Sequence, residues 1–330
     1  MARALSLAKK GPAHGPNPRV GCVILDPSGR IVGEGYHRGA GTDHAEVAAI
    51  ADARAKGESP AGGTAVVTLE PCRHVGRTGP CVDALESAGI ARVVYAVPDP
   101  GPESGGGGEA LRGRGIEAVH APGKGAEDLV RWFVHSVREG RPYVILKVGI
   151  TLDGRTAAAD GTSRWITGEK ARGHAHRVRA QADAIVVGTG TVLVDDPALT
   201  ARPGGRKSRH QPLKVVVGSR DTTGAKVWEE GEAVQIDTHD PAVALGELAA
   251  RDVRMSILEG GATLDSAFLR AGLVDEVHAY VAPMILGSGT SAIADLGIRT
   301  MGEALRLQDV TTSRLGDDIL IKGRPPGRGR

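Results

Sequence analysis

The chain contains 330 residues, which exceeds the usual size of one domain and predicts two. Its 41 Lys and Arg residues nearly balance 39 Asp and Glu residues, so the net charge is only +2, without the large basic field of a non-specific nucleic-acid binder. No apolar run approaches the roughly 20 residues that span a bilayer. The first ten residues also lack the long apolar region of a secretory leader. We therefore expect a cytoplasmic protein with no membrane or nucleic-acid partner.

Apolar runs and helical spacings alternate through the first 140 residues. The pattern predicts strands at 20–25, 31–36, 64–69, 92–97 and 116–119, and helices at 44–55, 81–88, 109–114 and 126–139. Strands that alternate with helices favour a mainly parallel, three-layer α/β domain. The segment Gly140-Arg141-Pro142 indicates the boundary, with a first domain over 1–140 and a second over 141–330.

Three residues of the first domain have the chemistry of metal ligands. One histidine and two cysteines, His44, Cys72 and Cys81, form a three-ligand set for zinc and leave the fourth tetrahedral position open to water. His44 and Cys81 open predicted helices, where the helix dipole favours a thiolate over a thiol. An open coordination position indicates catalysis. Cys22 lies in an apolar strand and is predicted to be an inert buried thiol.

Glu46 supplies the carboxylate that this chemistry needs. It lies two residues from His44 and so does not share its helix face, which favours a role toward the substrate. Zinc lowers the pKa of a bound water to about 7, and a carboxylate can carry the released proton to a ring nitrogen and a departing amine. Zinc deaminases typically place two residues between their cysteines, whereas here eight intervene. The longer loop brings the basic residues His74 and Arg77 beside the metal.

The second domain shows a different pattern. Buried strands are predicted at 143–150, 184–187, 213–217, 255–258 and 277–282, without the G-x-G-x-x-G of a Rossmann fold. Glycine turns at 188–190 and 260–261 follow apolar strands, where backbone amides can hold a pyrophosphate; ordinary tight turns are the alternative. The basic segment 323–330 is rich in Gly and Pro, and we expect a disordered tail.

Motifs in both halves resemble the bifunctional deaminase/reductase family of riboflavin biosynthesis. They cover residues 17–24, 44–46, 68–72, 147–149, 151–157, 165–167, 191–200 and 259–261. The resemblance implies a cytidine-deaminase-like first domain with zinc on the three ligands and Glu46 as proton shuttle. It implies a dihydrofolate-reductase-like second domain that uses NADPH. Asp43 and Arg73 depart from the family's usual Pro and Ser.

The resemblance also implies ligand contacts in both domains. Pyrimidine contacts fall on Asn17, His74 and Arg77. Cofactor contacts fall on Gly149, Trp165, Thr191, Asp195, Ser219, Gly261, Ala262, Thr263, Leu264, Asp265, Ser266 and Ala267. Substrate contacts of the second domain fall on Ser163, Arg179, Leu199, Arg202 and Glu259. Among these, Arg179 and Arg202 suit a ribosyl phosphate, and Arg220 beside Ser219 suits the 2′-phosphate of NADPH.

The sequence thus predicts an enzyme that deaminates a phosphoribosylated diaminopyrimidine and then reduces its ribosyl group to ribityl. Lys147, Asp195 and Glu259 are unranked candidates for the proton donor of the reduction. A paralogue that acts on a related pyrimidine is one alternative, and a zinc-binding sensor without turnover is another. A nucleic-acid-editing deaminase is a third, although 3% aromatic residues offer few platforms for stacked bases. A homodimer is expected.

Overall fold

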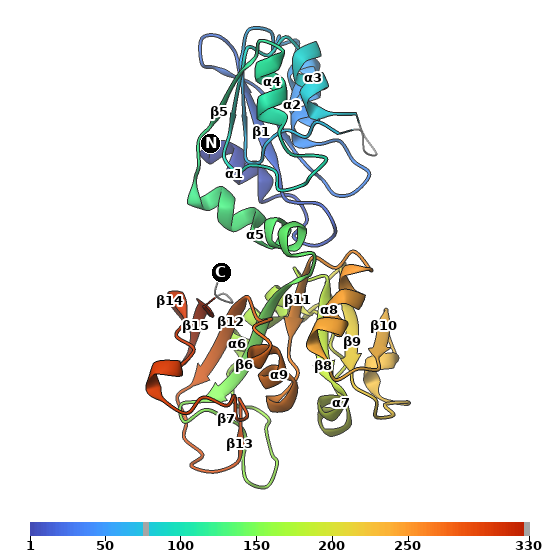
Figure 1. Cartoon of the computed structure of the whole chain (residues 1–330), viewed down its shortest axis with the longest axis vertical. Coiled ribbons are helices and arrows are strands. Elements are labelled where there is room, and N and C mark those ends of the chain that lie inside the picture. Colours follow the sequence, from blue (N-terminus) through green and yellow to red (C-terminus); the bar gives the residue numbers. More distant parts are fainter. Residues whose placement is uncertain (75–78, 327–330) are drawn as a thin grey trace. The chain divides into compact units, whose positions relative to one another are not determined.

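The computed structural model describes residues 1–74 and 79–326. The chain forms two compact units, Met1–Gly140 and Arg141–Arg330 (Figure 1). Each unit has its own sheet and its own apolar core. Within the described residues, no helix has both the length and the apolar composition that a membrane span requires.

Five strands in the described part of the first unit form one mixed sheet, in the order β2-β1-β3-β4-β5. Their bounds are β1 (Gly21–Leu25), β2 (Ile31–Tyr36), β3 (Thr64–Val67), β4 (Arg92–Tyr95) and β5 (Glu117–His120). Strands β3, β4 and β5 are parallel, as expected. The expectation of a mainly parallel sheet is wrong at β1, which pairs antiparallel with both β2 and β3. The connection from β1 to β2 is too short for the crossover that parallel pairing needs.

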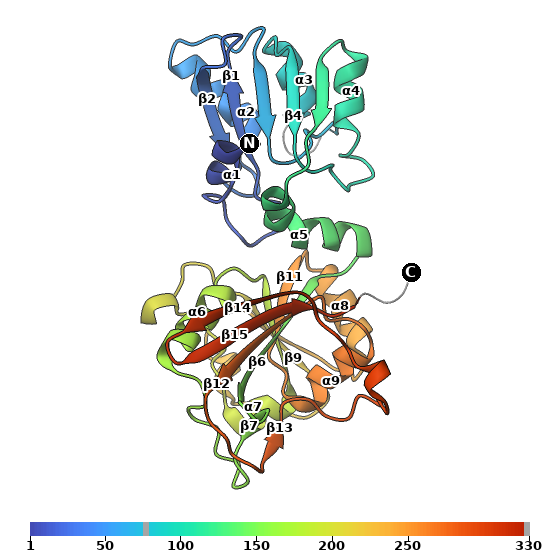
Figure 2. The same ribbon diagram turned by 90° about the vertical axis from the view of Figure 1, so that its left-hand side faces the viewer.

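Helices cover both faces of this sheet (Figure 2). α2 (Ala45–Ala55), α3 (Cys81–Ser87), α4 (Gly107–Gly113) and α5 (Lys124–Glu139) contribute to the larger core cluster, which also contains Cys22 and Ile24 of β1. α1 (Ala2–Ala8) packs Ala4 and Leu7 against Val23 in a separate cluster. Successive side chains of a strand point to opposite faces, so α1 and α2 lie on opposite sides of β1.

Two glycines let α2 lie directly on β2. A Cβ atom on Gly35 would come closer than 3.0 Å to the backbone of Ala45 and Ala49, and one on Gly33 would meet the Ala49 carbonyl equally closely. Strand and helix are therefore in backbone contact, which only glycine permits. This packing fixes the position at which α2 begins, next to His44.

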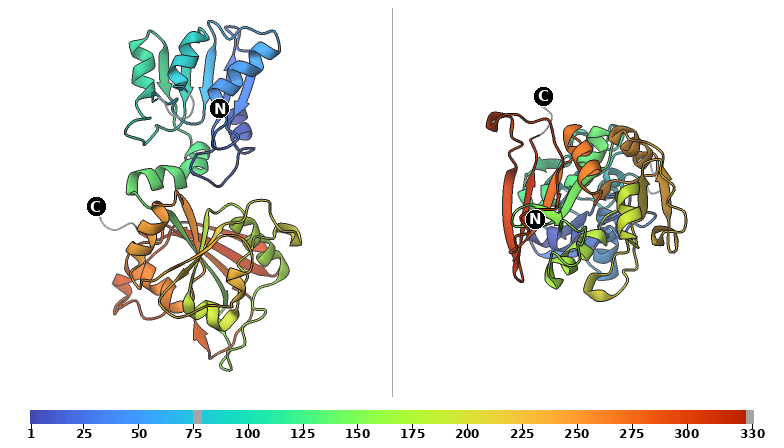
Figure 3. Two further views of the ribbon diagram at one scale, coloured as in Figure 1. Left: turned by 90° about the vertical axis from the view of Figure 1, so that its right-hand side faces the viewer. Right: turned by 90° about the horizontal axis from the view of Figure 1, so that it is seen from below.

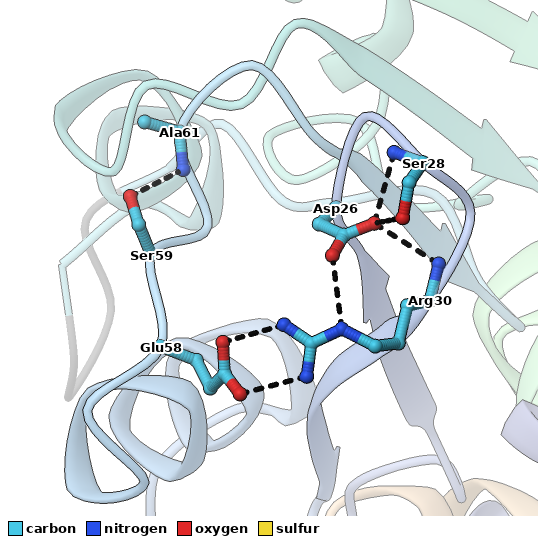
Figure 4. Close-up of polar contacts among 6 residues, drawn as sticks. All are labelled: Asp26, Ser28, Arg30, Glu58, Ser59 and Ala61. Atoms are coloured by element: carbon cyan, nitrogen blue, oxygen red, sulfur yellow. Dashed lines mark hydrogen bonds and ion pairs between the residues drawn. The ribbon is translucent and has the colours of Figure 1, made fainter.

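A surface ion-pair cluster ties the β1–β2 turn to the chain beyond α2 (Figure 4). Arg30 donates to both carboxylate oxygens of Glu58 at 2.7 Å and to Asp26 at 3.2 Å. Asp26 in turn accepts from the backbone N–H and hydroxyl of Ser28. Such exposed pairs contribute little stability each, so the cluster mainly defines the conformation of the turn.

The described residues of the second unit contain an eight-stranded sheet, in the order β10-β9-β8-β11-β6-β12-β15-β14. Its strands are β6 (Tyr143–Thr151), β8 (Ala184–Gly188), β9 (Leu213–Val217), β10 (Ala233–Ile236), β11 (Met255–Leu258), β12 (Glu276–Ala282), β14 (Gln308–Leu315) and β15 (Asp318–Arg324). Pairing is parallel from β10 to β12, and β15 and β14 add an antiparallel edge. A two-stranded sheet joins β7 (Arg155–Ala157) to β13 (Thr290–Ser291).

Helices again cover both faces (Figure 3). α8 (Pro241–Ala249) and α9 (Ala262–Arg270) pack Leu245 and Phe268 against one face. α6 (Glu169–Arg179) and α7 (Thr189–Asp195) pack Ala171 and Val192 against the other. Short 3₁₀ turns occur at Pro203–Gly205, Lys226–Trp228 and Met301–Glu303. Because the central strands are parallel, their carboxyl ends meet at one edge, where ligands bind in open α/β sheets.

The prediction of a disordered tail over 323–330 is wrong at its first two residues. Gly323 and Arg324 belong to β15, where Gly323 pairs with Val277 and Arg324 pairs with Gln308. The expectation is therefore wrong for these two residues, because strand pairing satisfies their backbone groups despite the Gly- and Pro-rich composition that follows. Residues 327–330 lie outside the described residues.

Replacement of Gly35 by alanine is expected to destabilise the first unit. The new methyl group would force α2 away from β2, and overpacking of this kind costs about 1–3 kcal/mol. We expect a lower unfolding temperature and weaker zinc retention, measured by calorimetry and metal analysis. Gly113→Ala is the matched control, because a Cβ there meets nothing within 4 Å. Equal stability of the two variants would contradict the role given to Gly35.

Candidate functional site

The three predicted metal ligands come together from three different elements. His44 is the N-cap residue of α2, Cys81 is the first residue of α3, and Cys72 follows β3. His44 Nδ1 lies 3.2 Å from the Cys81 sulfur and 3.5 Å from the Cys72 sulfur. Among the described residues, no fourth His, Cys, Asp or Glu joins this group, whose ligand atoms all lie within 4.8 Å of one another.

This donor set fits zinc. Bonds of about 2.0–2.3 Å to nitrogen and sulfur at tetrahedral angles place ligand atoms roughly 3.5 Å apart, close to the observed spacing. Both cysteines are buried and His44 is half-buried, which limits access of water to the open side. Hydrogen bonding to Cys81 and His44 lowers the pKa of Cys72 and so favours the thiolate that a metal requires. Cys22 is a free buried thiol outside this group.

Glu70 holds the connection that carries Cys72. Its two carboxylate oxygens accept hydrogen bonds from the backbone N–H groups of Asp99, at 3.0 Å, and Gly108, at 2.8 Å. Glu70 is buried, so these two bonds replace the water that the carboxylate loses. The segment between β3 and α3 is thus anchored immediately before the first thiol.

Glu46 lies in the first turn of α2, beside the ligands rather than among them. Its side chain is 3% exposed and interacts with Cys81. Burial raises the pKa of Glu46 to about 7, with the charge of His44 acting in the opposite direction. A carboxyl group that titrates near neutral pH can both take and return a proton.

His37, which the sequence analysis did not identify, orients Asn17. The His37 Nδ1 donates to the Asp43 carbonyl at 3.1 Å, which leaves Nε2 as the acceptor for the Asn17 side-chain N–H at 2.9 Å. The Asn17 oxygen therefore points away from His37. The ring of His37 also stands edge-on to His44, with 5.4 Å between ring centroids. The sequence offered one signal for this residue: His37 directly follows a predicted strand and lies seven residues before the predicted ligand His44.

The departures at 43 and 73 leave this arrangement intact. Asp43 contacts His37 through its backbone carbonyl, which any residue supplies. The Arg73 side chain is exposed and directs one guanidinium N–H toward the Pro102 carbonyl at 3.5 Å. His74 Nδ1 is buried without a hydrogen-bond partner among the described residues. Arg77 lies outside the described residues.

The second unit brings Lys147, Arg179 and Glu259 into one buried ion pair network. Arg179 donates to both oxygens of Glu259, at 2.8 and 2.7 Å, and Lys147 lies 3.4 Å from one of them. Burial alone would raise the pKa of Glu259, but the charges of Arg179 and Lys147 outweigh it and lower the pKa well below its usual value. Glu259 is therefore a permanent carboxylate. The predicted phosphate contact of Arg179 competes with this pairing.

Both predicted glycine turns lie at the carboxyl ends of neighbouring strands. β8 leads into α7 and β11 leads into Gly260-Gly261, and Thr191 donates to the Gly260 carbonyl at 2.9 Å. Gly261 has a φ of +77°, a conformation that glycine adopts without strain. Arg220, which follows the neighbouring β9, donates to the Thr189 hydroxyl at 3.3 Å. Ser219 lies 3.5 Å from His239 Nε2.

The remaining predicted contacts fall into exposed and buried groups. Trp165 is 68% exposed, with the Arg172 guanidinium 4.4 Å from its ring centroid. A Cβ on Gly149 would contact Thr167, and Asp195 accepts from Arg164 through its carbonyl. The predicted contacts with open or half-buried positions are Gly149, Ser163, Trp165, Thr191, Asp195, Arg202, Gly261, Ala262, Thr263, Leu264 and Ala267.

Three predicted contacts have buried side chains with other partners. Leu199 is 4% exposed and packs in an apolar cluster with Ile185 and Val187. Asp265 accepts from the Gly260 N–H at 2.9 Å, and burial raises its pKa to about 8. Ser266 accepts from the Ala294 N–H. Any contact of these residues with a ligand is left to their backbone groups.

The two sites define the class of protein: a zinc-dependent deaminase domain joined to a reductase domain. Residues 1–97 match the model of the cytidine and deoxycytidylate deaminase zinc-binding region. Residues 142–321 match the model of the RibD C-terminal domain, which has a dihydrofolate-reductase-like fold and uses NADPH.

The similarity to individual relatives extends over nearly the whole chain. The riboflavin biosynthesis protein RibD of Mycobacterium tuberculosis is 49% identical, over 93% of this chain and 90% of that protein. The structure of Acinetobacter baumannii RibD is 36% identical, with a TM-score of 0.89 over 98% of this chain and 97% of that one. A Thermotoga maritima structure of a diaminohydroxyphosphoribosylaminopyrimidine deaminase/5-amino-6-(5-phosphoribosylamino)uracil reductase is 34% identical, with a TM-score of 0.87 over 99% and 97% of the two chains.

The chain belongs to the RibD family, the bifunctional deaminases and reductases of riboflavin biosynthesis. The resemblance inferred from the sequence motifs, the two domain folds and the zinc and NADPH cofactors are confirmed at the level of this family. A small-molecule pyrimidine fits such an enzyme as substrate.

Removal of either thiol is expected to abolish stoichiometric zinc binding. Cys72→Ala and Cys81→Ala each leave two protein ligands, too few for the three-ligand centre of a catalytic zinc. Zinc content of the purified proteins, measured by plasma mass spectrometry, checks this. Cys22→Ala is the matched control and should keep its zinc, because Cys22 lies outside the ligand group. Full zinc in either ligand variant would show that the metal binds elsewhere.

Proposed function

We propose that the first domain, over 1–140, deaminates the diaminohydroxyphosphoribosylaminopyrimidine for which the Thermotoga maritima relative is named. The second domain, over 141–330, then reduces the ribosyl group of the product to ribityl with NADPH. The observation that carries this proposal is the His44, Cys72 and Cys81 group with Glu46 beside it and no fourth protein ligand among the described residues. A near-neutral net charge of +2 supports a small molecule rather than a nucleic acid as the partner.

In the deaminase site we assign zinc to His44, Cys72 and Cys81, where it supplies the Lewis acid that makes a water molecule nucleophilic near neutral pH. Glu46 would carry both protons of the attacking water in turn, the first to the ring nitrogen and the second, from the hydroxyl group of the adduct, to the departing amine. The ring carbon gains oxygen and loses ammonia, so the amino group becomes a carbonyl. The buried position of Glu46, next to the ligand Cys81, supports this role.

Substrate orientation in this site is assigned to Asn17, His74 and Arg77. The support for Asn17 is its fixed amide, whose oxygen points away from His37. The support for His74 is its buried Nδ1, which lacks a partner among the described residues and gains one from a ligand. Arg77 stays a prediction from the sequence.

In the reductase site, Lys147 is the proposed proton donor. NADPH supplies the hydride that reduces C1′ of the opened ribosylamine, and a proton must reach the neighbouring nitrogen. Glu259 is held as a carboxylate by Arg179, so it has no proton to give. It instead holds the ammonium group of Lys147, 3.4 Å away. Asp195, the third candidate, lies at the end of α7, and we assign it to cofactor binding rather than to proton donation.

The cofactor contacts that we assign are those with accessible groups at the carboxyl edge of the sheet. This set comprises Gly149, Trp165, Thr191, Asp195, Ser219, Gly261, Ala262, Thr263, Leu264 and Ala267. Asp265 and Ser266 have buried side chains and are assigned only through their backbone groups. Arg220 beside Ser219 is the proposed partner of the 2′-phosphate, supported by its place next to Thr189. The contacts that we assign to the ribosyl phosphate of the substrate are Ser163, Arg179, Leu199, Arg202 and Glu259.

Incubation of the purified protein with this pyrimidine tests the proposal. Without NADPH we expect ammonia and a product in which an amino group is replaced by oxygen, identified by mass. With NADPH we expect its absorbance to fall and the ribityl product to form. Failure to release ammonia would overturn the assignment of the first step, and an unchanged NADPH absorbance with the deaminated substrate would overturn the second.

Reciprocal variants should separate the two activities. Glu46→Gln removes the proton carrier and is expected to lower the rate of ammonia release at least about 100-fold, because general acid–base groups contribute 10²–10⁴-fold. Lys147→Met should lower NADPH oxidation to a similar extent. Each variant should keep the other activity near the parent value, measured with the substrate of that step. Loss of both activities in one variant would contradict independent sites.

We also propose a cytoplasmic homodimer. All three cysteines are free, which supports a reducing compartment. Among the described residues, β14 is the last strand at the antiparallel end of the second sheet, and its Val310 is 52% exposed. Ile319 of the neighbouring β15 is 48% exposed, and an edge strand beside exposed apolar side chains favours association. Light scattering should give twice the mass of one chain, and a mass of 34.1 kDa would refute the dimer. Fractionation of cells tests the compartment.

A further inference from the structure

The two arginines assigned to the sugar phosphate have different surroundings. Arg179 uses its guanidinium group to hold Glu259 and also donates to the Thr200 carbonyl at 3.2 Å. Arg202 is exposed and lies just before the 3₁₀ turn Pro203–Gly205. Its guanidinium group is the more available of the two for a phosphate. Phosphate binding therefore depends on where the Arg202 guanidinium group lies, and the conformation of the Arg202 backbone determines where its side chain starts.

His176 holds the backbone of Arg202. The Arg202 N–H donates to His176 Nδ1 at 3.2 Å, across 26 residues of sequence. His176 lies on α6, three residues before Arg179, so the two side chains share one face of the helix. α6 thus binds the 199–202 segment twice, through Arg179 to the Thr200 carbonyl and through His176 to the Arg202 amide.

The rest of the segment is fixed independently of His176. Leu199 is buried in an apolar cluster, and Gln211 accepts from the Ala201 N–H and donates to its carbonyl, at 2.9 and 3.0 Å. Leu199 also has a φ of +50°, a conformation that costs energy for a residue with a side chain and persists only when its surroundings impose it. Arg202 itself has two backbone contacts: its carbonyl accepts from the Gly205 N–H at 3.1 Å, and its N–H donates to His176.

His176 must be neutral to accept this hydrogen bond. Burial, together with the positive charges of Arg179 and Arg202, lowers its pKa to about 4, and the Glu259 charge and the Thr200 carbonyl only partly offset them. At neutral pH the ring proton therefore sits on Nε2 and Nδ1 keeps its lone pair. The ring adds no charge that would compete for the phosphate.

We propose that His176 is a positioning residue that sets the place of the Arg202 guanidinium group and thereby the affinity of the reductase site for the phosphate of its ribosyl substrate. This inference rests on the proposed function, in which Arg202 binds that phosphate. His176 does not touch the substrate. It acts through one hydrogen bond to the main chain of the residue that does.

The test compares two replacements of His176 in the full-length, zinc-loaded enzyme. His176→Leu keeps a similar volume and removes the acceptor, whereas His176→Asn places an oxygen near the position of Nδ1. Loss of one neutral hydrogen bond corresponds to roughly a 3- to 10-fold change in an equilibrium constant, here the affinity for the phosphate. We expect His176→Leu to raise KM for the deaminated phosphoribosyl substrate by about this factor, with kcat and KM for NADPH unchanged. His176→Asn should restore the parent KM.

Inorganic phosphate provides a second readout, as a competitive inhibitor against the ribosyl substrate. Its inhibition constant should rise in His176→Leu by the same factor as KM and return in His176→Asn. If His176→Leu proves insoluble, His176→Ala serves the same comparison. A fall in kcat alone, or an equal rise in KM for NADPH, would indicate general damage to the site and overturn the positioning role.

A double-mutant cycle with Arg202→Ala separates the two levels of the proposal. Once the guanidinium group is gone, His176→Leu should have no further effect on KM, since the two residues act through one contact. If Arg202→Ala itself leaves KM and phosphate inhibition unchanged, the phosphate role of Arg202 in the proposed function is wrong. If Arg202→Ala raises both while His176→Leu raises neither, only the inference about His176 is overturned.

Discussion

Backbone contact between α2 and β2 is the constraint on which the metal centre depends. The three ligands come from the start of α2, the connection between β3 and α3, and the start of α3, so no single element holds the site. Gly33 and Gly35 let the helix approach until its backbone touches the strand. That distance brings His44 within 3.5 Å of both sulfur atoms. A larger side chain on β2 would displace one ligand of three while leaving the other two in place.

The reductase site depends on a different balance, between burial and charge. A carboxylate removed from water needs other groups to replace its lost hydration, and Glu259 has two cations for this, Arg179 and Lys147. Because its folded pKa is depressed, the network stabilises the fold above the unfolded pKa of the carboxylate. That stability is lost as pH falls through the folded value. Removal of Arg179 would leave a buried anion and weaken the fold as well as the site.

The sequence predicted best where residue type alone determines the role. His44, Cys72 and Cys81 were found from their chemistry, and the buried strands from their apolar runs, because both signals are local. The strand β14 was missed because it is exposed along most of its length and carries no apolar run. The strand β15 was also missed, although it contains three consecutive apolar residues, 319–321. The antiparallel pairing of β1 with β3 also escaped prediction, since these strands are far apart in the sequence. The β1–β2 hairpin was readable from its short turn but was not used.

Residues that act through others were equally hidden from the sequence. His37 reaches Asn17 across 20 residues, and His176 reaches Arg202 across 26, distances that no spacing rule covers. The sequence predicted a phosphate contact for Arg179, but its partner Glu259 comes from 80 residues away and changes the role that its charge can have. The role of each of these residues depends on a partner that only the tertiary structure brings close, and a single sequence does not predict that partner.

Helix α6 touches several parts of the second unit's site with one face and its flanks. Arg172 lies over Trp165, His176 holds Arg202, and Arg179 holds Glu259. A helix of 11 residues is stiff over this length. Trp165, Arg202 and Glu259 belong to three separate segments that one helix face holds in place. A single substitution that loosens the packing of α6 would therefore displace all three together.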